Sequence, residues 1–133
     1  MRLYPPAWIF GREAVADDVF GAIRIRAGTA VSVCPWLLHR DPRWWDDPDR
    51  FDPDRFRPEA VKGRPRYAYV PFAAGPRMCI GNAFALMEMQ IIIPTILQRY
   101  RLDLMPSPPV VPKPTLTLRP MYGVPVRAIP RKG

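Results

Sequence analysis

The stretch Phe72–Gly81, FAAGPRMCIG, decides the fold of this 133-residue chain. It places a single cysteine, Cys79, between two glycines, shortly after Arg77 and directly before an apolar segment that predicts a helix. A cysteine binds a metal as its thiolate, and a nearby cation and a helix N-terminus both lower the pKa of a cysteine thiol. Gly75 and Gly81 allow the main chain to approach a flat, bulky group closely. These residues therefore predict a thiolate ligand at Cys79.

The stretch resembles the haem-binding signature Phe-x-x-Gly-x-Arg-x-Cys-x-Gly of the cytochromes P450, the haem-thiolate monooxygenases. Every fixed position of the signature is filled, by Phe72, Gly75, Arg77, Cys79 and Gly81. The resemblance implies that these residues bind the cofactor haem b, that Cys79 is the metal ligand, and that Phe72 covers its sulfur. The signature needs a strand-like segment before it and a helix after it, and residues 67–70 and 82–100 are expected to supply them. The alternative is a buried cysteine in a Gly-rich turn.

Three further motifs resemble landmarks of the same family, in the family's order. They are the Pro-Pro exit within Met1–Pro6, His39–Pro42 and Phe51–Phe56. In the family, a Glu-x-x-Arg helix supplies a glutamate and an arginine that form an ion-pair triad with an arginine of the last motif. Arg2 and Arg55 match the two arginines, and the glutamate would precede Met1. We therefore expect residues 1–133 to be the C-terminal haem-binding portion of a cytochrome P450 domain whose N-terminal part is absent.

The resemblance implies the cytochrome P450 fold, C-terminal part only, from a mainly α parent. Within this chain, the sequence pattern predicts an α+β arrangement with one long helix, two β hairpins and much irregular coil. Alternating apolar residues predict one hairpin that joins residues 23–25 to 31–33 through a turn at Gly28, and a second that joins 115–119 to 124–128.

The long helix is predicted from Asn82 to about Tyr100, where apolar residues form a stripe of helical spacing. Pro94 is expected to kink or break it, because proline cannot donate a hydrogen bond to the carbonyl of Gln90. Residues 35–70 are rich in Pro, Asp, Arg and Trp and are expected to form a meandering loop with short helical turns.

The composition points to an ordered but irregular chain. It includes 19 prolines among 133 residues, well above the average usage of about 5%, and this limits long helices and central strands. Four Trp, six Phe and five Tyr argue against disorder. We therefore expect the chain to pack against a large partner surface.

Two cysteines and one histidine limit the metal chemistry of the chain. Cys34 and Cys79 lack the clustered spacing of zinc or iron–sulfur sites, whereas a single protein ligand suits haem iron, whose in-plane donors come from the porphyrin. Cys34 lies beside an alternating apolar segment and is expected to be a reduced core thiol. His39 is expected to be a structural, hydrogen-bonded residue, with contact to the haem edge as the alternative.

The basic residues offer partners for the two propionates of haem, because a guanidinium binds a carboxylate through paired hydrogen bonds. The family signature implies Arg77 as one partner. The resemblance implies Arg12 as a second candidate, because the family often places a propionate partner at about this distance after the Pro-Pro exit. A solvated loop charge is the alternative. The net charge of the chain is +8, and its remaining basic residues could form a docking face for an acidic electron donor. An acidic segment elsewhere in the parent that cancels this charge is the alternative.

The resemblance implies a haem-dependent monooxygenase that inserts one oxygen atom of O2 into a lipophilic organic substrate, with electrons from an external ferredoxin or flavoprotein reductase. An anionic sulfur ligand favours O–O cleavage at the iron. By family position, substrate contacts come from Ala7–Ile9 and Thr115–Thr117, with simple core packing as the alternative. The oxygen-side helix and most of the substrate pocket lie outside this chain, so we expect the isolated chain to be inactive.

A second functional class is a module that binds nucleic acid or an acidic protein. Arg43–Trp45 and Arg64–Tyr67 place cations next to aromatic residues, as such modules do. Aspartates between residues 46 and 54 interrupt this basic surface, and phosphate binding gives no reason for the cysteine signature, so no nucleic-acid partner is expected. No segment predicts a membrane span. A cytoplasmic location is expected, with a membrane anchor in a preceding segment as the alternative.

Overall fold

The computed structural model describes residues 1–106 and 109–131 of the chain. The chain forms two compact units, Met1–Ala73 and Ala74–Gly133. Within the described residues, the secondary structure consists of one long helix, short helical turns and four two-stranded antiparallel sheets. The predicted α+β arrangement with one long helix is confirmed, but the strands pair differently from the prediction.

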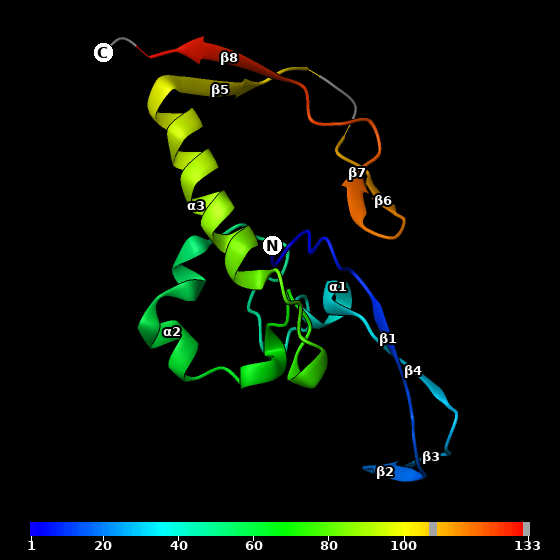
Figure 1. Cartoon of the computed structure of the whole chain (residues 1–133). Helices are drawn as coiled ribbons and strands as arrows, with labels where there is room; N and C mark the ends of the chain where they lie inside the picture. The colour runs from blue at the N-terminus through cyan, green and yellow to red at the C-terminus, as the bar shows by residue number, and fades with distance from the viewer. Residues whose placement is uncertain (107–108, 132–133) are drawn as a thin grey trace. The chain divides into compact units, whose positions relative to one another are not determined.

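The strands of the first unit form a long ribbon with a second hairpin at its far end (Figure 1). β1 (Phe10–Glu13) pairs with β4 (Ala30–Val33), so that Phe10 lies opposite Val33 and Glu13 lies opposite Ala30. β2 (Asp18–Phe20) pairs with β3 (Ile23–Ile25). The chain therefore goes out along β1, turns back on itself between β2 and β3, and returns along β4.

The predicted pairing of residues 23–25 with 31–33 is wrong. The turn at Gly28 is present, with φ of +77°, and the Gly28 amide donates to the carbonyl of Ala14 at 2.7 Å. That bond joins the turn to the segment after β1, so the turn directs β4 toward β1 rather than back along β3. The alternation of apolar and polar residues correctly identified the segments that form β3 and β4. It could not identify the strands with which they pair, because β1 and β2 carry no strong alternating pattern.

Residues 35–70 fold as short helical turns separated by irregular chain, which confirms the prediction for this segment. The turns are α1 (Pro35–Leu38), η1 (Pro53–Phe56), α2 (Pro58–Lys62) and η2 (Arg66–Ala68). The first three begin with proline, whose fixed φ suits the first turn of a helix and whose missing N–H has no partner there anyway. The strand-like segment predicted at 67–70 is wrong, because residues 66–68 form a 3-10 turn and only Tyr69 onward is extended.

The core of the first unit combines aromatic rings with arginine. Trp45, Ala68 and Val70 are 1%, 3% and 7% exposed, and the polar residues Arg2 and His39 are 5% and 0% exposed. Burial of Arg2 and His39 is favourable only if their polar atoms find hydrogen-bond partners. The partners are main-chain groups of residues far apart in the sequence, so this cluster ties the irregular chain together.

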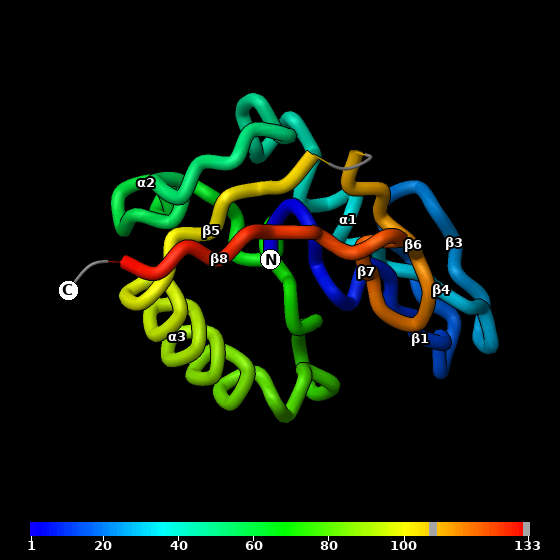
Figure 2. Tube along the Cα trace, turned by 90° about the horizontal axis from the view of Figure 1, so that it is seen from above, coloured from blue at the N-terminus to red at the C-terminus, as the bar shows by residue number. Residues whose placement is uncertain are grey.

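The second unit contains the long helix and two further sheets. Its elements are η3 (Gly75–Arg77), α3 (Asn82–Arg99), β5 (Tyr100–Leu104), β6 (Pro112–Pro114), β7 (Leu118–Pro120) and β8 (Val126–Pro130). β5 pairs with β8 and β6 pairs with β7, and Figure 2 shows β5 and β8 running side by side from the end of α3. The predicted hairpin of 115–119 with 124–128 is therefore wrong, because each of its arms pairs with a strand earlier in the chain.

Helix α3 confirms the predicted span and contradicts the predicted break. It continues through Pro94 to Arg99. Pro94 cannot donate to the carbonyl of Gln90, but the bonds before and after it remain, and the Thr95 hydroxyl adds a hydrogen bond of 2.6 Å to the carbonyl of Ile91. None of the helix residues is buried.

Candidate functional site

Cys79 lies in a short segment between η3 and α3 in the second unit. Gly75 opens this segment with φ of +75°, a conformation that an L-residue with a side chain rarely adopts. The Met78 amide donates to the Gly75 carbonyl at 3.0 Å and closes the turn, and the Asn82 amide donates to the Cys79 carbonyl at 3.4 Å. Main-chain turns on both sides therefore fix the backbone of Cys79, while its thiol is free and exposed.

Apolar residues close to Cys79 in the sequence are exposed. Met78 is 52% exposed, Ile80 is fully exposed at 102%, and Phe84 on the first turn of α3 is 64% exposed. A side chain at Gly81 would place its Cβ 3.9 Å from the Cys79 sulfur, so glycine keeps the space next to the sulfur open. One thiolate donor with exposed apolar residues near it in the sequence fits haem, which supplies the remaining in-plane donors and a large apolar face of its own.

The other predicted haem-binding residues fall into both units. Gly75, Arg77, Cys79 and Gly81 lie in the second unit, whereas Phe72 and Arg12 lie in the first. Arg77 is exposed and forms no ion pair with a described residue. Its guanidinium therefore retains its hydrogen-bonding capacity for an anion such as a propionate.

Arg12 is an exposed residue of β1. Its guanidinium donates to the Gly11 carbonyl at 2.8 Å and lies 5.1 Å from the centre of the Phe10 ring. These weak local contacts are compatible with a propionate partner and with a solvated loop charge. Contact between Arg12 and a propionate therefore stays a prediction.

Phe72 occupies a tight turn at the end of the first unit. The Ala73 amide donates to the Val70 carbonyl at 3.2 Å, so residues 70–73 form a turn with Pro71 in its second position, where proline is favoured. Ala73 has φ of +60°, a strained conformation for a residue with a side chain. Phe72 is half-buried. Backbone strain of this kind is often found at ligand sites, which is consistent with the predicted role of Phe72.

The two arginines of the family triad lie in the first unit. The Arg2 guanidinium donates to the carbonyls of His39, Pro48 and Arg50 at 2.8, 2.6 and 2.9 Å. Burial, with the nearby positive charges of Arg55 and Arg40, lowers the pKa of Arg2 below its ordinary value. Carbonyl oxygens thus satisfy the guanidinium hydrogens without neutralising its charge.

Arg55 is only partly satisfied. Its Nη2 donates to the Asp47 carbonyl at 2.9 Å, but its buried Nε has no hydrogen-bond partner among the described residues. The Asp52 carboxylate lies 4.0 Å from that Nε, beyond hydrogen-bonding distance. Arg2 and Asp52 also line a groove of about 500 Å³ next to Phe51, Phe56 and Tyr69. The unpaired Nε of Arg55 thus leaves one buried donor of the first unit without an acceptor among the described residues.

His39 confirms the expected structural role. Its ring is buried, its Nε2 lies 2.9 Å from the Val70 amide nitrogen, and its Nδ1 lies 3.3 Å from the Arg2 carbonyl oxygen. Burial, together with the positive charges of Arg2 and Arg40, lowers the pKa of His39 to about 4. Cys34 is likewise a free thiol, as expected, and its sulfur lies 3.3 Å from the Trp8 carbonyl oxygen.

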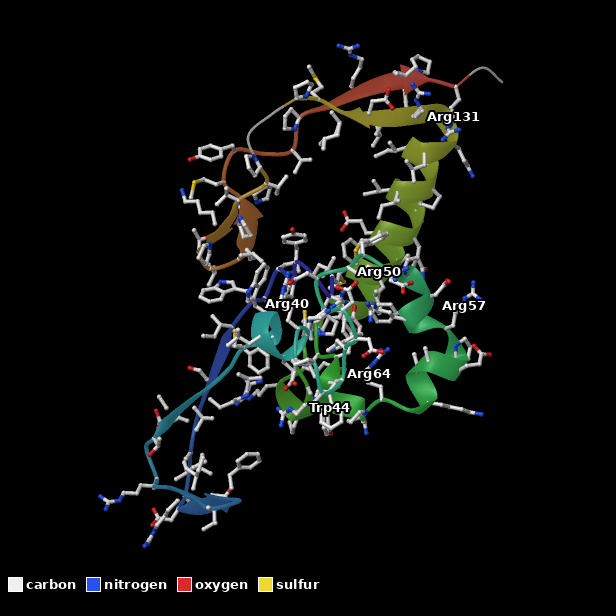
Figure 3. All side chains as sticks on the ribbon, turned by 180° about the vertical axis from the view of Figure 1, so that it is seen from behind. Arg40, Trp44, Arg50, Arg57, Arg64 and Arg131 are labelled. Carbon is white, nitrogen blue, oxygen red and sulfur yellow. The ribbon has the colours of Figure 1, made fainter. Side chains whose placement is uncertain are left out.

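Sequence reasoning missed the central position of Trp45. Its ring is 1% exposed, and the guanidinium carbons of Arg64 and Arg2 lie 3.9 and 5.0 Å from the ring centre. Figure 3 shows Arg64 among the crowded side chains of the first unit. The only signal in the sequence was the Trp44–Trp45 pair, which does not say which ring is buried.

The same cluster weakens the nucleic-acid interpretation. Trp45 is too deeply buried to stack on a base, and Arg64 is engaged with the Trp45 ring and with the Arg55 carbonyl at 2.7 Å. Two of the residues that suggested a nucleic-acid surface are therefore structural.

The described residues form neither of two other kinds of site. Within residues 1–106 and 109–131, no group of three or more His, Cys, Asp or Glu side chains is placed to hold a metal ion. Over the same residues, no helix combines the length and apolar character that crossing a membrane requires.

Comparison with known proteins gives a consistent result. The family model described as Cytochrome P450 matches residues 1–125. The Mycobacterium tuberculosis protein named cytochrome P450 132 is 50% identical over 123 residues, which is 92% of this chain and 26% of that protein. Thromboxane-A synthase of Sus scrofa is 40% identical over 134 residues, covering 98% of this chain and 25% of that enzyme. The chain thus spans about a quarter of the length of these relatives.

Solved structures share the fold as well. The retinoic acid-bound cyanobacterial CYP120A1 superposes with a TM-score of 0.92 at 32% identity, over 98% of this chain and 30% of that one. The haem domain of cytochrome P450DA gives a TM-score of 0.91 at 33% identity, over 98% of this chain and 29% of that one. The fold of this chain is therefore one that solved cytochrome P450 structures share.

Proposed function

The chain belongs to the cytochrome P450 family, whose cofactor is haem b, and we propose that it is the haem-binding portion of a monooxygenase, with Cys79 as the iron ligand. The single observation that carries this proposal is the free, exposed Cys79 thiol, whose backbone is held by main-chain turns and which exposed apolar residues flank in the sequence. When bound, haem supplies the activation of O2 that inserts one oxygen atom into an organic substrate.

The residues of this chain have distinct roles in the proposal. The Cys79 thiolate holds the iron and sets its electronic character, because an anionic sulfur donates electron density to the metal. The proposed role of Phe72 follows from its place in the signature: it shields the sulfur from water, which tunes the reduction potential. The proposed partners of the propionates are Arg77 and Arg12, through charge-assisted hydrogen bonds.

The proposed substrate is lipophilic, and it contacts Ala7–Ile9 and Thr115–Thr117. Leu116 lies at the tip of the β6–β7 hairpin and is 96% exposed, while Ile9 is 39% exposed. Apolar side chains at such positions favour an apolar ligand through the area they bury. The relatives span about four times the length of this chain, so the proposal includes further substrate contacts from outside residues 1–133 and no turnover by these residues alone.

Electrons reach the proposed enzyme from a separate protein, a ferredoxin or a flavoprotein reductase. The net charge of +8 supports this, because a basic surface accelerates association with an acidic partner at low ionic strength. A cytoplasmic location is part of the same proposal.

The test uses the haem-loaded full-length protein that contains this chain, reduced and exposed to carbon monoxide. The expected result is the red-shifted Soret band of thiolate-ligated haem, with loss of that band in Cys79→Ser and Cys79→His. Cys34→Ser is the matched control and should keep the band, since Cys34 is a half-buried thiol next to Trp8. A band that survives in Cys79→Ser would disprove the proposed ligand.

A further inference from the structure

The ring of His39 connects the beginning of the chain with the segment that leads to the cysteine signature. His39 has no exposed surface. Its Nε2 lies 2.9 Å from the Val70 amide nitrogen and its Nδ1 lies 3.3 Å from the Arg2 carbonyl oxygen. The rings of Tyr69 and Trp45 enclose it, with centroids 5.0 and 6.5 Å away.

The main chain determines which nitrogen of His39 carries the proton. The Val70 amide can only donate, so the Nε2 atom opposite it must be the unprotonated acceptor. The remaining proton of a neutral imidazole then lies on Nδ1, where it faces the Arg2 carbonyl, which can only accept. The neutral Nδ1-protonated ring is thus the one form of His39 that satisfies both neighbours.

The Val70 amide is the first polar group of the turn that carries Phe72. The Val70 carbonyl accepts a hydrogen bond from the Ala73 amide at 3.2 Å, which closes the turn over Pro71 and Phe72. Ala73 holds a strained φ of +60°, so the turn needs an external support to persist. Val70 is 7% exposed and His39 is its side-chain partner.

We propose that His39 is a positioning residue for Phe72, acting through the hydrogen bond from the Val70 amide to its unprotonated Nε2. The relevance of Phe72 to haem rests on the proposed function, whereas the hydrogen bond itself can be measured without haem. Protonation of Nε2 would replace the acceptor by a donor and release the turn.

The surroundings of His39 keep it neutral at physiological pH. The charged groups that act on it are Arg2, Arg40 and the amino terminus, and the ring of Tyr69 packs beside it. Burial and the positive charges among these groups lower its pKa to about 4, and none of them is an anion that would favour the imidazolium.

The first test is nuclear magnetic resonance of the 15N-labelled 133-residue chain at pH 7. We expect the chemical shifts of the His39 ring nitrogens to report a neutral, Nδ1-protonated ring, and we expect hydrogen exchange at the Val70 amide at least tenfold slower than in an unfolded peptide. An Nε2-protonated or charged ring, or a Val70 amide that exchanges at the unfolded rate, would overturn the proposal.

Two matched variants separate positioning from general packing. Gln reaches with its amide oxygen toward the place of Nε2, so His39→Gln keeps an acceptor for Val70 and loses the donor to Arg2. His39→Asn does the reverse, because its shorter amide reaches only the place of Nδ1. Slow exchange at Val70 should persist in His39→Gln and be lost in His39→Asn. Equal exchange rates in the two variants would contradict the proposal.

The haem-loaded full-length protein supplies the second readout. The reduction potential of His39→Asn should shift in the same direction as that of Phe72→Ala, while His39→Gln stays close to the unchanged protein. A potential in His39→Asn equal to that of His39→Gln would count against positioning of Phe72. If the carbon monoxide band of the unchanged protein does not depend on Cys79, the proposed function fails, and the exchange data still decide the role of His39.

Discussion

The arginine–aromatic cluster of the first unit and the cysteine segment of the second are built in opposite ways. In the cluster, Arg2, His39 and Trp45 are at most 5% exposed, and main-chain carbonyls and amides bind the first two. In the cysteine segment, main-chain turns fix the backbone while the side chains of Cys79 and Ile80 face outward. The cluster therefore uses its side chains to stabilise the fold, and the cysteine segment keeps its side chains available for a ligand.

This contrast explains why so irregular a chain has a defined structure. Long-range hydrogen bonds from the Arg2 guanidinium to main-chain carbonyls connect distant parts of the chain. In a protein with a larger sheet, hydrogen bonds between strands would supply this connection. A charged donor to a carbonyl contributes about 1.5–3 kcal/mol, more than a neutral hydrogen bond. The cysteine segment has no such side-chain network, so its substitution should affect ligand binding far more than stability.

The largest effect is expected from Trp45→Ala. Removing the ring leaves a cavity and takes away the surface against which Arg2 and Arg64 pack, and such truncations cost about 3–5 kcal/mol. Urea unfolding of the chain measures this loss. Trp44→Ala is the matched control, since Trp44 is 41% exposed, and should cost under about 1 kcal/mol. Equal losses for the two tryptophans would break the distinction between buried cluster and surface.

The second effect concerns pH and should be slightly smaller. His39 has a pKa of about 4 in the folded chain against 6.5 for the ordinary group. Above pH 6.5 the ring of His39 is unprotonated in both the folded and the unfolded state. Its full contribution to the free energy of unfolding is then present. As pH falls from about 6.5 to 4, the unfolded state binds the proton first, so the free energy of unfolding should fall by about 3 kcal/mol.

The control for this pH dependence is His39→Gln, which has no titrating ring. Its unfolding free energy should be flatter than that of the unchanged chain between pH 6.5 and 4, when both are measured by urea titration. Identical slopes in the two proteins would mean that His39 is not held neutral in the folded state.

A smaller effect of the opposite sign is expected from Ala73→Gly. The φ of +60° costs energy for alanine but not for glycine. Glycine also increases the entropy of the unfolded chain, so the net gain should be at most about 1 kcal/mol. Ala74→Gly, where φ is −154°, gives no relief and should be neutral or destabilising. A loss of stability in Ala73→Gly equal to that in Ala74→Gly would show that the turn is unstrained.

The smallest effect on stability is expected in the cysteine segment itself. Ile80 is fully exposed, and surface substitutions usually change the free energy of unfolding by less than about 0.5 kcal/mol. Ile80→Ser should therefore leave urea unfolding unchanged while weakening haem uptake, which can be followed by absorbance during titration with iron protoporphyrin IX. Strong destabilisation by Ile80→Ser would remove the contrast between the two regions.

Sequence patterns predicted the local elements better than their partners. Helical spacing predicted α3 almost to the residue, and the composition of residues 35–70 predicted short helical turns without their bounds. Strand pairing was wrong in both hairpins, because the nested order β1–β4 around β2–β3 depends on long-range contacts that no local alternation encodes. Of the kink or break predicted at Pro94, the break is wrong, because one missing hydrogen bond does not end this helix of 18 residues.

The candidate site was predictable only in part. A thiol at Cys79 and a cation at Arg77 follow from the signature, and both are exposed as a ligand site requires. The burial of Trp45 and the bond from Val70 to His39 were not predictable, since both join residues far apart in the sequence through a fold with little regular structure. The roles of Arg12 and Phe72 at the haem stay predictions.

X-ray absorption at the iron edge of the haem-loaded full-length protein tests the central claim most directly, because it reports the atoms bound to the iron. The account predicts one sulfur atom in the first coordination shell of iron, lost in Cys79→Ser and retained in Cys34→Ser. An iron with only nitrogen and oxygen ligands in the unchanged protein would contradict it.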